Sequence, residues 1–241
     1  MKGYITDIET MGLVDGPGTR LVVFLSGCPL RCIYCHNPET WKISDFTQAI
    51  SPHDVLNMYN KFKVYYGENG GVTFSGGEPL VQSKFVLECA KLLKKHNIST
   101  ALDTSGAVSG NFSKLLDFID LVILDVKAVD ENEYKKICGN SIENHNKFLS
   151  LCQHKNKKLW LRQVIVPSLN DDENHITKLA NYIKNIKNVE KVELLPYHSM
   201  AKDKYKKLGI DYKLNDTMDM DKEKCIELEK KLMLMLTKDA H

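Results

Sequence analysis

Six short segments of the chain are nearly continuous runs of apolar or β-branched residues. Runs of this kind are typical of strands that are buried on both faces of a sheet. We therefore expect six mostly buried strands, at residues 21–26, 71–75, 99–104, 121–126, 158–166 and 189–196.

Between these runs, apolar residues recur at the spacing of an amphipathic helix. The first such segment opens with Ser51 and Pro52, a favourable cap and first helical residue, and Asp54 stands three positions after the cap. The pattern predicts helices at residues 52–62, 83–96, 111–118, 131–137, 142–153 and 173–186, with a closing helix at 221–237.

Alternating strands and helices predict an α/β fold with a parallel sheet and right-handed crossovers. Six units are fewer than the eight of a closed barrel. The sheet is then either open and doubly wound or a curved partial barrel, and periodicity alone does not choose. No repeat or long linker divides the chain, so we expect one domain over residues 1–241.

Composition narrows the class of partner and compartment. Of the 241 residues, 43% are hydrophobic and 27% are charged, and the net charge is only +2. So small a net charge does not indicate an electrostatic field strong enough to hold nucleic acid or an anionic membrane. The N-terminus lacks the apolar stretch of a signal peptide, and no apolar run approaches the roughly 18 residues of a membrane span. We expect a cytoplasmic protein, in a compartment where thiols stay reduced.

Polar residues follow most of the predicted strands. In sheets of this class the active site lies at the C-terminal ends of the strands. We therefore expect one pocket lined by Cys28, Gly76–Glu78, Asp103, Thr104, Asp125, Lys127 and His198.

Three of the seven cysteines, Cys28, Cys32 and Cys35, form a C-x3-C-x2-C motif in the loop after the first predicted strand. The odd total and this crowding argue against a disulfide framework. Three thiolates on a short loop can hold three irons of a [4Fe–4S] cubane, which leaves the fourth iron open to another ligand.

Three other interpretations of the motif remain open. His36 is available as a fourth ligand for zinc, although structural zinc sites usually have two separated ligand pairs. A ferredoxin would need a fourth cysteine at family spacing. Buried cysteines can also cluster by chance. Four further cysteines are dispersed, and we expect them to be small core residues: Cys89, Cys138, Cys152 and Cys225.

The cysteine loop, with Tyr34 before its last cysteine, resembles the radical S-adenosylmethionine (SAM) superfamily. More closely, the chain resembles the pyruvate formate-lyase activating enzymes. The matching segments occur in order along almost the whole chain, at residues 14–20, 27–37, 73–79, 102–106, 121–127 and 194–198.

This resemblance implies a partial (β/α)6 TIM-like barrel of the radical SAM type. It also implies that a reduced [4Fe–4S] cluster cleaves SAM and that a radical then takes the Cα hydrogen from a glycine of a partner enzyme. The implied partner is pyruvate formate-lyase, and the implied electron donor is a protein such as flavodoxin or ferredoxin.

The resemblance further implies the roles of individual residues. Glu78 would support its loop or the ammonium group of SAM. Contact with SAM is implied for Tyr34, Cys35, His36, Gly77, Asp125, Val126, Lys127 and His198. A monovalent cation, Na+ or K+, would be held by Asp103, Thr104, Asp125 and the carbonyl of Ile123, unless the two carboxylates simply pair with lysine or arginine. Contact with the partner's peptide is implied for Asp15, His36 and Arg162.

Three other functions compete with activation of pyruvate formate-lyase, and features of the chain or simple assays distinguish them. They are an activator of another glycyl radical enzyme, a radical SAM enzyme acting on a small molecule, and an iron–sulfur electron carrier. Many activators of other glycyl radical enzymes carry a cysteine-rich insert after the cluster loop. The segment from Asn37 to Ser51 contains no cysteine, which favours the pyruvate formate-lyase type.

Overall fold

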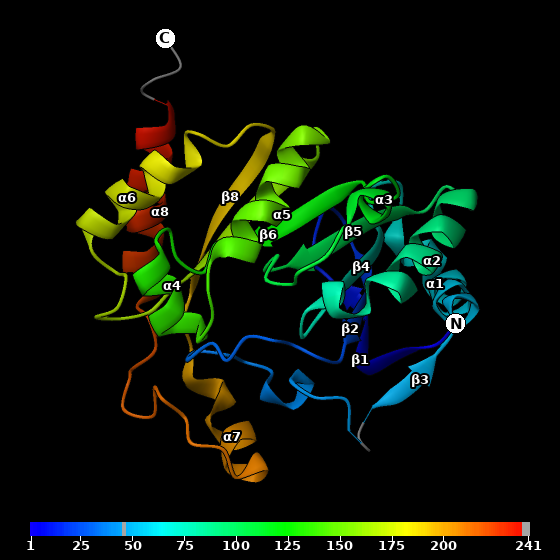
Figure 1. The fold of residues 1–241 in the computed structure, drawn as a ribbon, viewed down its shortest axis with the longest axis horizontal. Coiled ribbons are helices and arrows are strands. Elements are labelled where there is room, and N and C mark those ends of the chain that lie inside the picture. Colours follow the sequence, from blue (N-terminus) through cyan, green and yellow to red (C-terminus); the bar gives the residue numbers. More distant parts are fainter. Residues whose placement is uncertain (45–46, 238–241) are drawn as a thin grey trace.

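The computed structural model describes residues 1–44 and 47–237, and its described strands form one eight-stranded sheet (Figure 1). The strand order is β3-β1-β2-β4-β5-β6-β7-β8. From β2 to β8 all neighbouring strands are parallel, whereas β1 is antiparallel to both β2 and β3.

The six predicted strands are confirmed as the six parallel ones. They are β2 (Arg20–Leu25), β4 (Gly71–Gly76), β5 (Ser99–Thr104), β6 (Leu121–Asp125), β7 (Lys158–Ile165) and β8 (Val189–Pro196). The middle residues of β2, β4, β5 and β6 are buried on both faces, which is why these strands appear as continuous apolar runs, whereas only Leu194 of β8 is buried. The parallel register brings all their C-terminal ends to one edge of the sheet.

Two strands were not predicted from the sequence, namely β1 (Gly3–Gly12) and β3 (Gln48–Ile50). In strand β1, Ile5 is buried, but after a register shift between Ile5 and Asp7 the side chains of Asp7 and Glu9 are exposed. Its apolar content is therefore too low to stand out as a run. As a correction, the cysteine loop follows the second strand of the chain, not the first.

The predicted helices are present with small changes at their ends. They are α1 (Pro52–Tyr66), α2 (Ser83–Lys95), α3 (Ser113–Leu116), α4 (Glu131–Cys138), α5 (Glu143–His154), α6 (Glu173–Ile183) and α8 (Lys222–Thr237). The predicted capping box opens α1, where Ser51 and Asp54 bond each other's backbone N–H groups. The structure shortens the segments expected at 111–118 and 173–186 to α3 and α6.

One further helix, α7 (Lys202–Leu208), was missed because its sequence is mostly lysine around the buried Tyr205. Short 3-10 helices at Pro38–Thr40, Pro79–Gln82 and Ser199–Ala201 lie in the loops after β2, β4 and β8. In Figure 1, α7 lies below the sheet, on the same side as the loop that carries the cysteines.

The helices cover the parallel sheet in two groups. Helices α1 and α2 pack against each other over β2, β4 and β5, while α6 and α8 pack together beside β8 (Figure 1). The four dispersed cysteines are buried, as predicted, in α2, α4, α5 and α8. None of the described helices is long and apolar enough to cross a membrane.

Candidate active site at the cysteine loop

A cavity of about 280 Å³ lies at the C-terminal ends of the parallel strands. It gathers most of the residues singled out in the sequence, from five different strands or the loops that follow them. Its lining includes Cys28, Cys32, Tyr34, Cys35, His36, Gly77, Asp103, Thr104, Asp125, Lys127 and Arg162.

The cysteine loop is held in place by backbone hydrogen bonds at both ends. The N–H of Gly27 donates to the carbonyl of Thr40 over 2.7 Å, and the N–H of Cys28 donates to Trp41 over 3.2 Å. On its other side the N–H of Arg31 donates to the carbonyl of Cys138 at the end of α4, over 2.9 Å. These contacts fix the loop without using any cysteine side chain.

The three thiols are poorly solvated. Burial raises the pKa of Cys28 to about 12, and it also raises the pKa of Cys35. The pKa of Cys32 is raised well above its usual value by the Cys138 side chain and by burial. Each thiol therefore needs a neighbouring cation before it gives up its proton, as iron would provide on binding.

The arrangement of the thiols bears on the kind of metal group they fit. Among residues 1–44 and 47–237, no three His, Cys, Asp or Glu side chains are gathered closely enough to hold one metal ion. A cubane does not require such convergence, because each thiolate binds a different iron. Three soft sulfur donors on one short loop, facing one cavity, fit a [4Fe–4S] cluster.

Gly77 lies where two loops come into direct contact. A Cβ atom at this position would stand 2.5 Å from the carbonyl oxygen of Gly27 and 3.0 Å from that of Thr40. Its own N–H donates to the carbonyl of Leu25 over 2.7 Å. Only glycine allows the loop after β4 to rest against the cysteine loop in this way.

Glu78 is completely buried and joins the loops after β4 and β5. Its carboxylate accepts hydrogen bonds from Thr104 Oγ1 at 2.5 Å, from Ser105 Oγ at 2.5 Å and from the Ser105 and Leu80 N–H groups. Burial raises the pKa of Glu78, while these donors act in the opposite direction. Its side chain supports the loops and does not line the cavity.

Two carboxylates and two cations meet on the cavity wall. Lys127 Nζ donates to Asp125 Oδ2 over 2.6 Å, and Ser75 Oγ donates to Asp103 Oδ2 over 2.7 Å. Burial and the charge of Asp125 raise the pKa of Asp103 to about 7, while Arg162 acts to lower it. Burial alone would lower the pKa of Lys127, but Asp125 raises it well above its usual value.

Arg162 connects the cavity wall to the loop before β2. It stands level with Asp125 on β6 and Glu193 on β8, and its Nε donates to Glu193 over 2.9 Å. Its Nη2 donates to the carbonyl of Val14, next to Asp15. Burial raises the pKa of Asp15, and the Arg162 charge opposes that shift.

His36 and His198 come together although the chain separates them by most of its length. Their ring centroids are 3.8 Å apart, at an interplanar angle of 66°. Burial and the neighbouring His198 lower the pKa of His36 to about 4. His36 lines the cavity, but His198 does not, contrary to the expectation from the sequence.

Two comparisons with known sequences bear on this site. A family model described as a 4Fe-4S single cluster domain matches residues 14–148, which include all three loop cysteines. A pyruvate formate-lyase-activating enzyme of Clostridium pasteurianum is 50% identical over 237 residues, which cover 98% of this chain and 99% of the relative.

The chain belongs to the family of pyruvate formate-lyase-activating enzymes. This confirms the family predicted from the six matching segments. The alignment with the Clostridium relative covers nearly the whole chain. It therefore includes the cysteine loop, the strand ends and the C-terminal helix.

Solved structures of similar fold support the predicted partial barrel. A domain of a pyruvate-formate lyase-activating enzyme from Bacteroides vulgatus aligns with a TM-score of 0.55 at 23% identity, covering 70% of this chain and 94% of that one. Streptococcus suis SuiB bound to S-adenosylmethionine aligns with a TM-score of 0.64 at 13% identity, covering 88% and 45%. The fold of this activating-enzyme family member is that of radical SAM proteins, as predicted.

Besides Glu78, His198 and Asp15, two further residues predicted for the site, Val126 and Ile123, do not line the cavity. Val126 is buried in the core, and its N–H donates to the carbonyl of Arg162 over 2.7 Å. Ile123 pairs with Asp103 across the sheet, and its side chain packs with Ala101 and Leu121. Contact through these residues would therefore involve the backbone.

Arg20 supports the loop before β2 without lining the cavity, and sequence reasoning did not single it out. It is fully buried, and it donates to Thr73 Oγ1 over 2.7 Å and to the carbonyl of Pro17 over 3.1 Å. Thr73 Oγ1 in turn donates to the carbonyl of Asp15 over 2.6 Å. The sequence did offer a signal for this role: Arg20 stands directly after a glycine-rich loop, at the start of an apolar strand.

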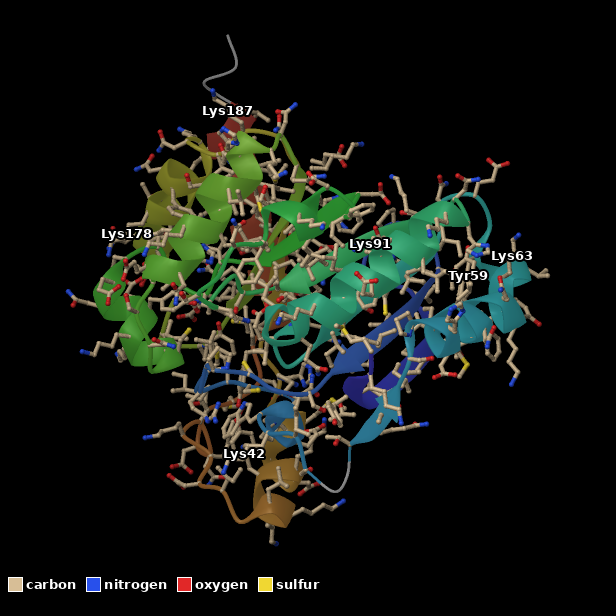
Figure 2. All side chains as sticks on the ribbon, turned by 45° about the vertical axis from the view of Figure 1, so that its right-hand side comes forward. Lys42, Tyr59, Lys63, Lys91, Lys178 and Lys187 are labelled. Carbon is tan, nitrogen blue, oxygen red and sulfur yellow. The ribbon has the colours of Figure 1, made fainter. Side chains whose placement is uncertain are left out.

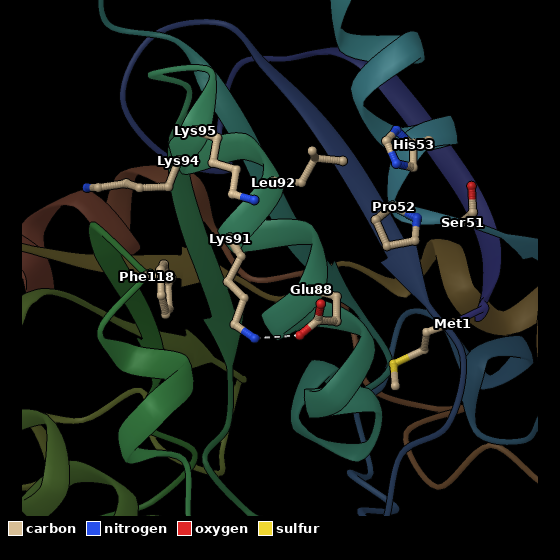
Figure 3. Close-up of a pocket in the computed structure, with 10 residues that line it drawn as sticks. All are labelled: Met1, Ser51, Pro52, His53, Glu88, Lys91, Leu92, Lys94, Lys95 and Phe118. Carbon is tan, nitrogen blue, oxygen red and sulfur yellow. Dashed lines mark hydrogen bonds and ion pairs between the residues drawn. The ribbon is translucent and has the colours of Figure 1, made fainter.

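A second cavity, of about 620 Å³, lies between α1 and α2 and carries none of the predicted chemistry (Figure 3). It is lined by lysines of α2 together with Met1 and Phe118. Lys91 is paired with Glu88, and Lys94 is paired with Asp120. The residues predicted to bind the cluster or SAM therefore do not line this second cavity.

Proposed function

We propose that this chain activates a glycyl radical enzyme of the pyruvate formate-lyase type. The observation that carries the proposal is the single cavity that faces the three loop cysteines on one side and the strand-end residues on the other. The relative at 50% identity supports the choice of partner. We place the reaction in the cytoplasm, where the thiols stay reduced.

Cys28, Cys32 and Cys35 are the residues that would hold the cluster. When bound, a reduced [4Fe–4S] cluster supplies the electron that splits SAM and so generates the radical that takes a hydrogen atom from the partner's glycine. The loop that carries the cysteines is fixed by its contacts to Thr40, Trp41 and α4, so the thiols are positioned before iron arrives.

SAM would bind across the cavity from the cysteines. We assign its contacts to Tyr34, Cys35, His36, Gly77, Asp125, Val126, Lys127 and His198. Lys127 offers an ammonium to a carboxylate, and the Gly76–Gly77 turn lets backbone atoms approach a ligand closely. Tyr34 lies under Lys127, whose Nζ is 5.7 Å from the ring centroid, so the aromatic ring helps to position that charge.

A cation, Na+ or K+, would join Asp103, Thr104, Asp125 and the carbonyl of Ile123. The chain's own charges already balance much of this region, because Lys127 pairs with Asp125 and Arg162 acts on Asp103. Binding of the cation would therefore compete with Lys127 for Asp125. Burial and the charge of Asp125 raise the pKa of Asp103, and a bound cation would offset this repulsion between the carboxylates.

The partner's glycine loop would enter near Asp15, His36 and Arg162. Arg162 and Thr73 both donate to carbonyls of the loop before β2, which holds Asp15 beside the barrel wall. Leu13 and Val14, next to Asp15, expose 73% and 74% of their surface. An apolar pair beside a fixed carboxylate suits an extended peptide, whose N–H groups need acceptors.

The proposal is tested by the cleavage of SAM. The cluster is reconstituted anaerobically, the protein is reduced in the presence of SAM, and 5′-deoxyadenosine and methionine are measured. We expect both products from the unchanged chain and from Cys89→Ala, and neither from Cys35→Ala. If a protein with a fully loaded cluster formed neither product, the proposal would be wrong, and the iron–sulfur electron carrier would be the remaining candidate function.

A further inference from the structure

Trp41 touches the cysteine loop at two points. Its indole Nε1 donates to the Sγ of Cys35 over 3.3 Å, and its carbonyl accepts the N–H of Cys28 over 3.2 Å. Trp41 is only partly buried, so one edge of the indole reaches a cluster cysteine while part of the residue remains accessible from outside.

Arg31 covers one face of this indole. Its guanidinium carbon lies 4.7 Å from the centroid of the Trp41 ring, and its Nη1 donates to the carbonyls of Cys28 and Leu30 over 2.8 and 2.6 Å. Tyr205 of α7 packs edge-on against the indole at 5.8 Å. Trp41 is therefore held in one orientation by the cysteine loop, Arg31 and α7.

Trp41 also lines an outer cavity of about 680 Å³. The apolar part of its lining comes from Trp41, Pro38, Leu208 and Ile210, and none of the described residues lines both this cavity and the one in front of the cysteines. Trp41 thus stands between the two, bonding to a residue of the inner cavity while facing the outer one.

We propose that the outer cavity is the docking site of an acidic one-electron carrier protein, and that the electron enters through Trp41 and Cys35. This inference rests on the proposed function, because a cluster that splits SAM needs an electron from outside. One electron leaves the reduced carrier and enters the oxidised cluster, and no bond of Trp41 is made or broken.

The charges around the outer cavity indicate the chemistry of the carrier. Within the described ranges, no carboxylate forms an ion pair with Arg31 or Lys42, whereas the third cation of this region, Lys204, is paired with Glu39 at 2.5 Å. Two uncompensated cations beside an apolar surface attract an acidic partner and accelerate its encounter. Small, weak interfaces are typical of electron-transfer partners.

The separation of the two cavities has a functional consequence. The carrier would occupy the face formed by Trp41 and α7, while SAM and the partner's glycine loop would use the inner cavity and the Asp15 loop. The carrier could therefore reduce the cluster while the partner's glycine loop stays bound at the inner cavity.

The test compares two reductants on the cluster-loaded protein. The cluster is reduced anaerobically in a stopped-flow instrument, either by a reduced acidic flavodoxin or ferredoxin or by dithionite. The measured quantity is the ratio of the carrier rate constant to the dithionite rate constant. We expect Lys42→Glu to lower this ratio by about tenfold at low ionic strength, and by less in high salt.

Lys63→Glu is the matched control, since it makes the same charge change in exposed α1, far from Lys42 (Figure 2). We expect it to leave the ratio unchanged. An unchanged ratio in Lys42→Glu, an equal fall in Lys63→Glu, or a wild-type carrier rate that does not fall with added salt would overturn the docking site. The proposed function would survive those outcomes if dithionite-reduced protein still cleaves SAM.

Trp41→Phe tests the contact between the indole and the cluster cysteine. The variant keeps an aromatic ring but removes the N–H that donates to Cys35, and hydrogen bonds to cluster sulfurs raise the reduction potential. We expect a more negative potential in an anaerobic redox titration, together with a lower ratio of the two rate constants. A loaded variant with both quantities unchanged would exclude Trp41 as the point of entry.

Discussion

The Sγ of Cys138 lies 3.8 Å from the Sγ of Cys32, behind the cysteine loop. Cys138 is the last residue of α4, and its carbonyl accepts the N–H of Arg31. The sequence placed Cys138 among the dispersed core cysteines, and it is indeed fully buried, but it is also a neighbour of a cluster residue. It does not line the cavity.

Cys138 is therefore expected to be dispensable for iron, in contrast to its neighbour. Cys138→Ala should retain the full iron and sulfide content after anaerobic reconstitution, whereas Cys32→Ala should lose most of the cluster. The same contrast is expected between Cys28 or Cys35 and the buried Cys89, Cys152 and Cys225. Full cluster assembly without Cys32 would refute the ligand assignment.

Glu78→Ala should destabilise the cluster-free protein by about 3 kcal/mol, because it leaves buried donors of Thr104 and Ser105 without an acceptor. Denaturant unfolding measures the change. Glu88→Ala, which removes an exposed carboxylate from α2, serves as the control and should have a much smaller effect. Equal losses in the two variants would contradict the supporting role of Glu78.

Lys127→Met should weaken SAM binding by more than tenfold, since it keeps the side-chain length but removes the cation beside Asp125. In the unchanged protein, SAM should alter the electron paramagnetic resonance spectrum of the reduced cluster. The variant should need far more SAM for the same alteration, whereas Lys95→Met, on the exposed face of α2, should behave normally. A spectrum that saturating SAM leaves unchanged would count against direct ligation.

Asp103→Ala should weaken SAM binding by roughly tenfold or more, and activity should depend on Na+ or K+. The reason is that Asp103 and Asp125 need a counter-charge when a carboxylate of SAM joins them. Titration with SAM at fixed sodium or potassium measures both effects, with Asp117→Ala as a remote control. Indifference to the cation and to the substitution would show that Lys127 and Arg162 alone balance the pair.

Strands β2, β4, β5 and β6 could be predicted because burial on both faces produces a nearly continuous run of apolar residues. Strand β1 could not, since its Asp7 and Glu9 face water and interrupt any apolar run. The site residues at the strand ends were predictable for a topological reason: a parallel sheet brings Asp103, Asp125 and Lys127 to one edge whatever the details of packing.

The contacts that order the loops could not be predicted in the same way. Arg20 acts through the side chain of Thr73 and the carbonyl of Pro17, and no spacing in the sequence indicates such a bond. Trp41 reaches Cys35 only because the 3-10 helix at Pro38–Thr40 turns the chain back. Both depend on where loops meet in space.

The most direct test of the account is the appearance of a radical on the partner. The reconstituted protein is incubated anaerobically with SAM, a reductant and a pyruvate formate-lyase, and the lyase is examined by electron paramagnetic resonance. The account predicts a carbon-centred glycyl radical that requires both SAM and Cys35. Cleavage of SAM without any radical on the lyase would contradict the assignment of the partner.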